Sequence, residues 1–451
     1  MAHERFHYKS LEEVKRRAAE LGAELPFAQD TRVLAQPLTV GKIIFPNRLG
    51  IAPMEGADST PEGEPTDYTV RRYINEAIGG SAVIWFEAIS IVEEGRSSKT
   101  QLLLTRDTLE AFKKMTFAVK EAGLKANGYT PYLIMQANHS GRYSNPDNKP
   151  APMIAYHHPI LEQYRAADDS CIVTDDYLKS LEEKFGEAAL LAKEAGFDAV
   201  DIKSCHGYLL AELASAYDRP GEYGGSFENR FRLLKNGIRA AKVYEDDAFS
   251  VTSRIGIYDG YAYPFGFGVA PGGGTTPDMT EPIRLVRELH DEQGLSMVNL
   301  TMGNPYATTH VTRPFDFGKY ETDEHPFEGL SRMICGIGTV KKAVPEMTIW
   351  ASAPTYLRAY SDLFSAGAVE QGLCDGMLFG RMAFADPDFA NEIVKHGRID
   401  PNRVCLTCGK CGDLIRAHKP TGCVIRDSKT FMPFYKEFLE IKKTQPANFR
   451  G

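Results

Sequence analysis

The chain has 451 residues, of which 43% are hydrophobic and 25% are charged, and its net charge at pH 7 is −8. This composition is that of a folded globular protein, and it excludes a disordered or collagen-like chain. The negative charge and the scattered Lys and Arg residues argue against nucleic-acid binding. The length allows one large α/β barrel with additions, or two to three smaller domains.

The amino-terminal residues predict a short amphipathic helix. Leu11, Val14, Ala18 and Leu21 recur at helical spacing, so we expect a helix over 10–22 that packs on the rest of the protein. The region lacks the apolar core of a signal peptide, and no stretch approaches the about 20 apolar residues of a membrane span. We therefore expect no membrane contact and a cytoplasmic protein whose thiols stay reduced.

Beyond residue 34, short apolar runs alternate with longer amphipathic segments such as 176–196 and 228–244. Such alternation indicates βα units. Eight strands with intervening helices over roughly 350 residues predict a (β/α)8 TIM barrel, with an open doubly wound sheet as the alternative. The predicted strands are 48–54, 81–90, 131–137, 197–203, 249–256, 296–303, 347–353 and 375–381.

Two predicted connections are long: 143–175 follows the third strand and 258–280 follows the fifth. Because both leave the carboxyl ends of strands, where barrel active sites lie, we interpret them as pocket walls or lids, with mobile surface insertions as the alternative. The chain has no Gly-x-Gly-x-x-Gly turn between a strand and a helix, so we do not predict a dinucleotide-binding domain.

Seven motifs follow one another along residues 34–426. They are NRLGIAPM, FEA with EGR, MQANHSGR, EAGFDAVDIKSCHGYLLAEL, YDRPGEYGGSFENRFRLL, SRI and GRMAFADPDF. In order and spacing they resemble the old yellow enzyme family of FMN-dependent oxidoreductases. The resemblance implies an FMN-binding (β/α)8 barrel over 34–398, between a helical extension at 1–33 and a carboxyl-terminal segment at 399–451.

The resemblance also implies residues that contact FMN. Those beside the flavin ring would be Pro53, Met54 and Glu55, with Ala88 and Gln136 at its pyrimidine side and Arg254 at N1 and O2, where a fixed cation stabilises charge on the reduced ring. The phosphate would lie on Gly380 and Arg381, whose guanidinium fork suits it. The family's usual glycines after the seventh strand are replaced here, so backbone amides of Ser352 and Ala353 would complete the phosphate site.

Three residues of KSCHGY match the family's substrate residues. Lys203 and His206 would hold a substrate carbonyl, hydride would pass from flavin N5 to the β carbon, and Tyr208 would protonate the α carbon. The family usually has an imidazole at the position of Lys203. An ammonium favours an anionic oxygen, so we expect a substrate with a carboxylate. The alternative is a lysine paired with a barrel carboxylate.

Glu55 also departs from the family pattern, which usually has Thr, Cys or His after APM. An ionised Glu55 near the flavin would disfavour the anionic reduced ring and lower its potential. A protonated Glu55 would instead donate a hydrogen bond. The sequence leaves these two states open.

Half of the eight cysteines lie in one short segment, at Cys405, Cys408, Cys411 and Cys423. The spacing C-x2-C-x2-C-x11-C can ligate a cubane cluster or a tetrahedral Zn²⁺, and three close cysteines with one distant cysteine are more typical of iron–sulfur sites. The position after the eighth barrel unit is similar to the family branch of 2,4-dienoyl-CoA reductase and trimethylamine dehydrogenase. That resemblance implies a 4Fe-4S cluster.

The leading hypothesis is therefore an FMN- and 4Fe-4S-dependent ene-reductase of anaerobic metabolism that reduces the C=C bond of a small unsaturated carbonyl or carboxylate compound. Because that branch continues into FAD- and NAD(P)-binding domains and this sequence ends soon after Cys423, we expect an external electron donor, such as a ferredoxin or an NAD(P)H flavoprotein. Direct reduction by NAD(P)H is the alternative. Two other functions stay open: an amine dehydrogenase or demethylase, and a non-catalytic electron-transfer subunit. The sequence is compatible with a homo-oligomer for each of these functions and for the leading one.

Overall fold

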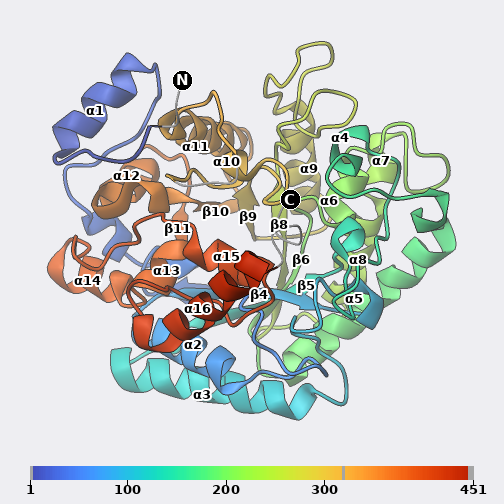
Figure 1. Cartoon of the computed structure of the whole chain (residues 1–451), viewed down its shortest axis with the longest axis horizontal. Helices are drawn as coiled ribbons and strands as arrows, with labels where there is room; N and C mark the ends of the chain where they lie inside the picture. Colours follow the sequence, from blue (N-terminus) through green and yellow to red (C-terminus); the bar gives the residue numbers. More distant parts are fainter. Residues whose placement is uncertain (1–3, 317–319, 445–451) are drawn as a thin grey trace.

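The computed structural model describes residues 4–316 and 320–444, and a ring of short parallel strands lies at its centre with helices around it (Figure 1). The strands follow the order β7-β6-β5-β4-β3-β11-β10-β9-β8. Their bounds are β3 (Leu49–Ile51), β4 (Val83–Ser90), β5 (Tyr132–Asn138), β6 (Ala199–Ile202), β7 (Ser250–Thr252), β8 (Arg254–Gly256), β9 (Met297–Thr301), β10 (Thr348–Ser352) and β11 (Gly376–Phe379).

The ring has eight strand positions, because β7 and β8 are the two halves of the predicted strand 249–256. They are divided at Ser253, whose hydroxyl donates a hydrogen bond to the carbonyl of Ile202 over 2.7 Å. β7 pairs with β6, β8 pairs with β9, and a bridge between Ser204 and Ile255 joins the ring at the same point. The prediction of a TIM barrel is therefore confirmed.

An antiparallel hairpin closes the amino-terminal end of the barrel. It consists of β1 (Leu38–Val40) and β2 (Ile43–Phe45). Phe45 is buried and meets the ring of Trp350 edge-on, with the ring centroids 5.5 Å apart. Because side chains fill this end, the opposite end, at the carboxyl termini of the strands, is the one available for a ligand.

Two of the predicted helices show how their observed bounds compare with the sequence. α5 (Asp175–Glu194) begins where the Thr174 hydroxyl accepts a hydrogen bond from the backbone N–H of Tyr177, and an acidic first turn suits a helix amino terminus. The predicted helix 228–244 is instead two helices that meet at Phe231. The barrel helices are α2 (Asp67–Ile78), α3 (Leu109–Asn127), α5, α7 (Phe227–Arg230), α8 (Arg232–Lys242), α9 (Thr280–Asp291), α11 (Pro326–Ala343) and α12 (Ser361–Glu370).

Shorter helices occupy the connections and the ends. The amino-terminal α1 begins after Ser10, whose hydroxyl accepts from the backbone N–H of Glu13, and its bounds agree with the predicted helix. No helix in the described ranges is long and apolar enough to cross a membrane. The shorter helices are α1 (Leu11–Glu20), α4 (Pro159–Glu162), α6 (Leu209–Ala214), α10 (Thr309–Thr312), α13 (Arg381–Ala385), α14 (Phe389–His396), α15 (Lys410–Arg416) and α16 (Ser428–Thr444).

The carboxyl-terminal helices α15 and α16 lie across the face of the barrel shown in Figure 1, next to α2. A hydrogen-bonded ion pair joins Arg71 of α2 to Asp427 over 2.7 Å. The rings of Tyr68 and Phe434 meet edge-on at 5.5 Å. The cysteine-containing segment is therefore packed on the barrel.

The two long connections contact each other. In 143–175, the ring of His158 donates a hydrogen bond from Nε2 to the carbonyl of Phe265, which belongs to 258–280, over 3.0 Å. His158 also packs edge-on against Tyr261 at 5.2 Å. The two segments thus form one wall beside the barrel end.

Candidate active site and cysteine pocket

Lys203, His206 and Tyr208 lie together at the carboxyl end of β6. Lys203 directly follows the strand, and the next turn holds His206 and Gly207 at positive φ angles of 68° and 70°. This turn brings Tyr208 back toward Lys203, whose Nζ lies 3.7 Å from the centroid of the tyrosine ring. A cation over an aromatic face is attracted by the negative face of the ring.

Lys203 is only 5% exposed and forms no ion pair within the described residues. Burial lowers the pKa of its ammonium to about 8, while Cys205 and Glu55 oppose the shift. The barrel carboxylate considered as a partner, Asp201, instead accepts hydrogen bonds from other groups. Among the described residues, no carboxylate therefore lies at ion-pair distance from this ammonium.

His206 is neutral at pH 7. Its burial and the positive charges of Arg254, Lys203 and Arg313 hold its pKa well below the usual range. Its Nε2 lies 3.4 Å from the hydroxyl of Thr301 at the end of β9. A neutral imidazole offers one donor and one acceptor, so it can hold a substrate oxygen without adding charge.

Glu55 lies near the same group, and its Oε1 accepts a hydrogen bond from the Ser97 hydroxyl. Burial raises the pKa of the Glu55 carboxyl, whereas the Ser97 hydrogen bond and the charge of Lys203 oppose this. Compared with a carboxyl group in water, Glu55 is therefore shifted toward its protonated form.

A cluster of tyrosines, which the sequence did not predict, surrounds Tyr208. Tyr208 Oη lies 2.8 Å from Tyr306 Oη, and the Tyr306 ring stacks on Tyr143 with centroids 3.8 Å apart. Asn304 holds both ends of this stack: its Nδ2 donates to Tyr143 Oη over 2.8 Å, and its Oδ1 accepts from the Tyr306 backbone N–H over 2.9 Å. The only signal in the sequence was the turn-forming Asn-Pro pair at 304–305 after β9.

Inside the barrel, Arg254, Gln136 and Asp201 form a polar layer. Asp201 accepts hydrogen bonds from the side-chain amide of Gln136, the indole N–H of Trp85 and the backbone N–H of Arg254. Burial raises the pKa of Asp201 to about 6. The Nε of Arg254 is buried without a hydrogen-bond partner in the described structure. An unpaired buried guanidinium nitrogen is what an anionic or carbonyl-rich ligand such as FMN would satisfy.

The other predicted FMN residues lie at strand ends around this layer. Met54 packs so closely on Gly380 that a Cβ there would lie 3.1 Å from its sulfur, and Ala353 adopts a left-handed φ of 72°. The side-chain amide of Gln101 donates to the carbonyl of Ala88 over 2.9 Å, and Ser352 Oγ accepts from Asn299 over the same distance. Pro53 is partly exposed and directly precedes Met54.

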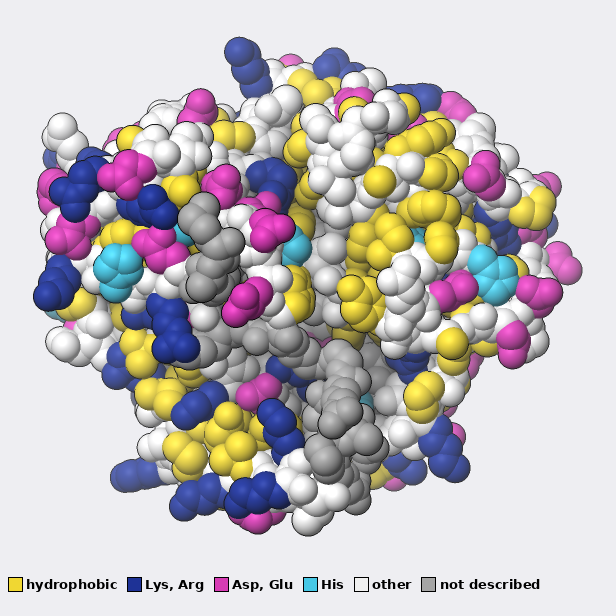
Figure 2. Space-filling view, turned by 45° about the horizontal axis from the view of Figure 1, so that its top comes forward, with side chains coloured by type: hydrophobic (Ala, Val, Ile, Leu, Met, Phe, Trp, Pro, Cys, Tyr) yellow, Lys and Arg dark blue, Asp and Glu magenta, His cyan; other side chains and the backbone are white. Residues whose placement is uncertain are grey.

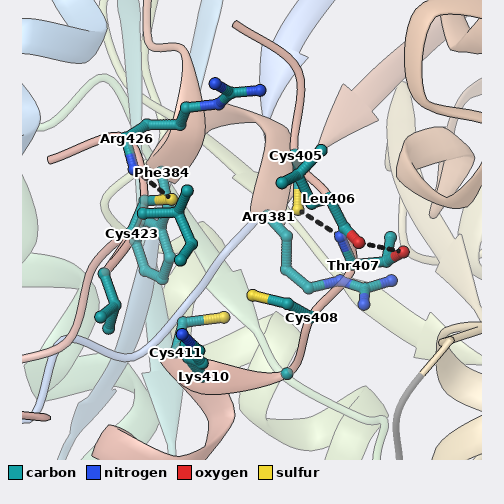
Figure 3. Close-up of a pocket in the computed structure, with 13 residues that line it drawn as sticks. Arg381, Phe384, Cys405, Leu406, Thr407, Cys408, Lys410, Cys411, Cys423 and Arg426 are labelled. Carbon is teal, nitrogen blue, oxygen red and sulfur yellow. Dashed lines mark hydrogen bonds between the residues drawn. The ribbon is translucent and has the colours of Figure 1, made fainter. Parts of the chain in front are cut away.

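The four clustered cysteines line one pocket, together with the basic residues Arg381, Lys410 and Arg426. Figure 3 shows the sulfur atoms of Cys408 and Cys411 pointing toward each other, with Cys405 and Cys423 on opposite sides of the pocket.

All four cysteines are free thiols. Among the described residues, no three His, Cys, Asp or Glu side chains are arranged as a metal ion would require. Four sulfur donors surrounded by cations suit a metal centre that takes four thiolates.

Arg381 lies at this pocket as the first residue of α13, which follows β11 after Gly380. Its Nη2 donates a hydrogen bond to the carbonyl of Pro314 over 2.8 Å. Burial raises the pKa of the Cys405 thiol to about 12, while the charge of Arg381 opposes this. Burial lowers the pKa of Arg313, the residue before Pro314, to about 10. The predicted phosphate residue thus stands between the eighth strand and the cysteines.

Two further contacts fix the cysteine segment to the barrel end. Thr407, between the first two cysteines, donates from its hydroxyl to Asp316 Oδ2 over 2.9 Å. Asp316 is 4% exposed and also pairs with Arg358. On the other side, the backbone N–H of Thr421 donates to the carbonyl of Gly56 over 2.8 Å. The loop after β3 and the loop after β9 therefore each contact both the cysteine segment and the group around Lys203, His206 and Tyr208.

Comparison with known proteins gives the family. Over 215 residues the chain is 34% identical to the NADPH dehydrogenase of Bacillus velezensis, a match that covers 47% of this chain and 60% of that protein. Residues 33–267, more than half of the chain, match the model of the NADH:flavin oxidoreductase / NADH oxidase family.

Two solved structures share the fold. A 2-naphthoyl-CoA reductase complex has a TM-score of 0.70 at 19% identity, with 90% of this chain and 58% of that chain covered. The old yellow enzyme homologue of Zymomonas mobilis has a TM-score of 0.59 at 20% identity, with 81% and 94% covered. The chain spans about 60% of the length of the curated relatives that it matches first. The protein belongs to the NADH:flavin oxidoreductase / NADH oxidase family.

Proposed function

We propose that this protein is an FMN-dependent ene-reductase that acts on a conjugated C=C bond next to a carboxylate or carbonyl group. The observation that carries the proposal is the meeting of Lys203, neutral His206 and Tyr208 at one barrel end. Two of these groups can hold a substrate oxygen and the third can give a proton. Family membership supports a flavin as the redox group.

FMN, when bound, supplies the hydride. Arg254, whose Nε is buried without a hydrogen-bond partner among the described residues, would hold the flavin at its pyrimidine side together with Gln136. Lys203 and His206 would bind the substrate oxygen and draw electron density from the C=C bond. Tyr208 would then transfer its hydroxyl proton to the α carbon. Each of these groups lies at a strand end of the same barrel, so the barrel fixes their positions relative to one another.

In the same proposal, Cys405, Cys408, Cys411 and Cys423 ligate a 4Fe-4S cluster. Their shared pocket and the three cations on its wall support this assignment, because such cations offset the negative charge of a tetrathiolate centre. The electrons would come from a separate carrier, a ferredoxin or an NAD(P)H flavoprotein, or from NAD(P)H directly.

Two measurements on anaerobically purified protein test the cofactors. Iron, sulfide, zinc and flavin analysis should give a 4Fe-4S cluster and one FMN per chain. Cys408→Ser should lose iron and keep FMN, whereas Cys335→Ser, which removes a thiol outside the pocket, should keep both. Zinc in place of iron would refute the cluster.

Turnover is tested by stopped-flow reoxidation of the reduced protein with matched unsaturated acids, ketones and thioesters. At least one should reoxidise the flavin, and Tyr208→Phe should slow the reaction about 100-fold with FMN retained. If no compound of the panel reoxidises the flavin, the proposed direction is wrong.

Oxidation of an amine is the second candidate, because Glu55 and the ring of Tyr208 could receive a cation. Lys203 opposes it by like charge. Bleaching of the oxidised flavin by methylated amines would favour this candidate. If both screens are negative while both cofactors are bound, the result would favour an electron-transfer subunit.

A further inference from the structure

The phenol of Tyr208 is nearly shut off from water. It is 5% exposed, with the ammonium of Lys203 over one part of its ring and Tyr143 edge-on at 5.9 Å. A tyrosine that gives its proton to a substrate must recover one before the next turnover. Water has little access to do this directly.

Tyr306 offers the route. Within the described structure, the only hydroxyl in hydrogen-bond distance of Tyr208 Oη is Tyr306 Oη, at 2.8 Å. Tyr306 is 43% exposed, far more than Tyr208. The pair therefore joins a buried side chain to one whose surface is partly open to water.

The Tyr306 ring is also held in place. It stacks on Tyr143 at an interplanar angle of 17°. Asn304 fixes both residues, and Asn304 itself fills the space beside Gly207, where a Cβ would lie 2.1 Å from its amide nitrogen. A fixed donor and acceptor at 2.8 Å is a geometry suited to proton transfer.

We propose that Tyr306 is the proton-relay residue that restores Tyr208 after each turnover. Once Tyr208 has given its proton to the substrate, the O–H bond of Tyr306 breaks and a new O–H bond forms on Tyr208. Tyr306 then takes a proton from water or a buffer acid, so that one solvent proton is consumed per product. Charged groups near the pair are Glu55, Lys203 and Arg165. The proposal rests on the proposed role of Tyr208.

The activity test separates the first turnover from later ones in Tyr306→Phe, which keeps the ring and removes the hydroxyl. The first turnover should stay within about twofold of wild type, while steady-state turnover falls about tenfold or more and is partly restored by added imidazole as a small proton donor. Tyr164→Phe, which removes an exposed phenol outside the stack, should change neither. An unchanged steady-state rate, or an equal loss in both phases, would overturn the relay.

A second test needs neither cofactor nor substrate. In the protein without FMN, exchange of the Tyr208 hydroxyl proton with water can be followed by NMR saturation transfer. It should slow about tenfold or more in Tyr306→Phe and stay the same in Tyr164→Phe. An unchanged exchange rate would overturn the relay. If Tyr208→Phe turns over normally although this exchange test is positive, the relay exists and the proposed proton donor is wrong.

Discussion

Raising the pH should abolish the reaction with an unsaturated acid by discharging Lys203. Burial lowers the pKa of this ammonium to about 8, so it is about nine-tenths charged near pH 7 and about one-tenth charged near pH 9. The neutral amine attracts a carboxylate far less. The second-order rate constant with an acid substrate should therefore fall about tenfold per unit above about pH 8, a slope of about 1.4 kcal/mol per unit.

Three groups near Lys203 do not titrate in this range. The pKa of His206 is held well below its usual value, that of Tyr208 is raised well above its own, and the pKa of the Cys205 thiol is raised to about 11. A descending limb centred near 8 would therefore belong to Lys203. Lys203→Met should lose this limb together with most of the activity on acids.

The assay is stopped-flow reoxidation of the reduced protein at constant ionic strength, since salt screens charges. Cinnamate serves as the acid, and its methyl ketone analogue serves as the matched neutral substrate. The ketone carries no negative charge, so its rate constant should fall less than that of the acid across this pH range. A limb near 8 that survives in Lys203→Met, or one that is as deep with the ketone as with the acid, would refute the reasoning.

Three further predictions concern stability. Glu76 has a pKa raised to about 8 by burial, so wild type should lose stability as pH rises from about 4.5 to about 8, and Glu76→Gln should melt higher than wild type above that range. Gly56→Ala should cost about 3 kcal/mol in a denaturant titration, because its Cβ would lie 2.0 Å from the guanidinium of Arg72. Asp316→Asn should lower the melting temperature by several degrees and speed thiol labelling of the cysteine segment, whereas the exposed Asp169→Asn should do neither. For each variant, a stability equal to that of wild type in the stated measurement would contradict the corresponding prediction.

The barrel could be predicted from the sequence because its strands are apolar runs buried on both faces. All eight residues of β4 are buried, and such a run differs clearly from the amphipathic helices on either side. The break at Ser253 could not be predicted, since it depends on a hydrogen bond to Ile202 of the neighbouring strand. The break at Phe231 likewise lies inside a continuous helical pattern.

The site was predictable only in part. Lys203, His206 and Tyr208 share one motif, so their proximity follows from the chain itself. Tyr306 and Asn304 lie about a hundred residues further along, on a loop without a motif, and reach Tyr208 only because the barrel brings β6 and β9 to the same end. Ser97 meets Glu55 for the same reason. Contacts between loops of different strands depend on the tertiary fold, which local patterns do not encode.

The two contacts of the cysteine segment have a consequence for assembly. Hydrogen bonds from Thr421 to Gly56 and from Thr407 to Asp316 join this segment to the loops after β3 and β9, which come together only when the barrel has closed. Figure 2 shows one face of the molecule, on which Lys and Arg side chains lie among hydrophobic ones. The cysteine segment therefore holds this position only on a closed barrel, so the metal centre proposed above would report on barrel closure.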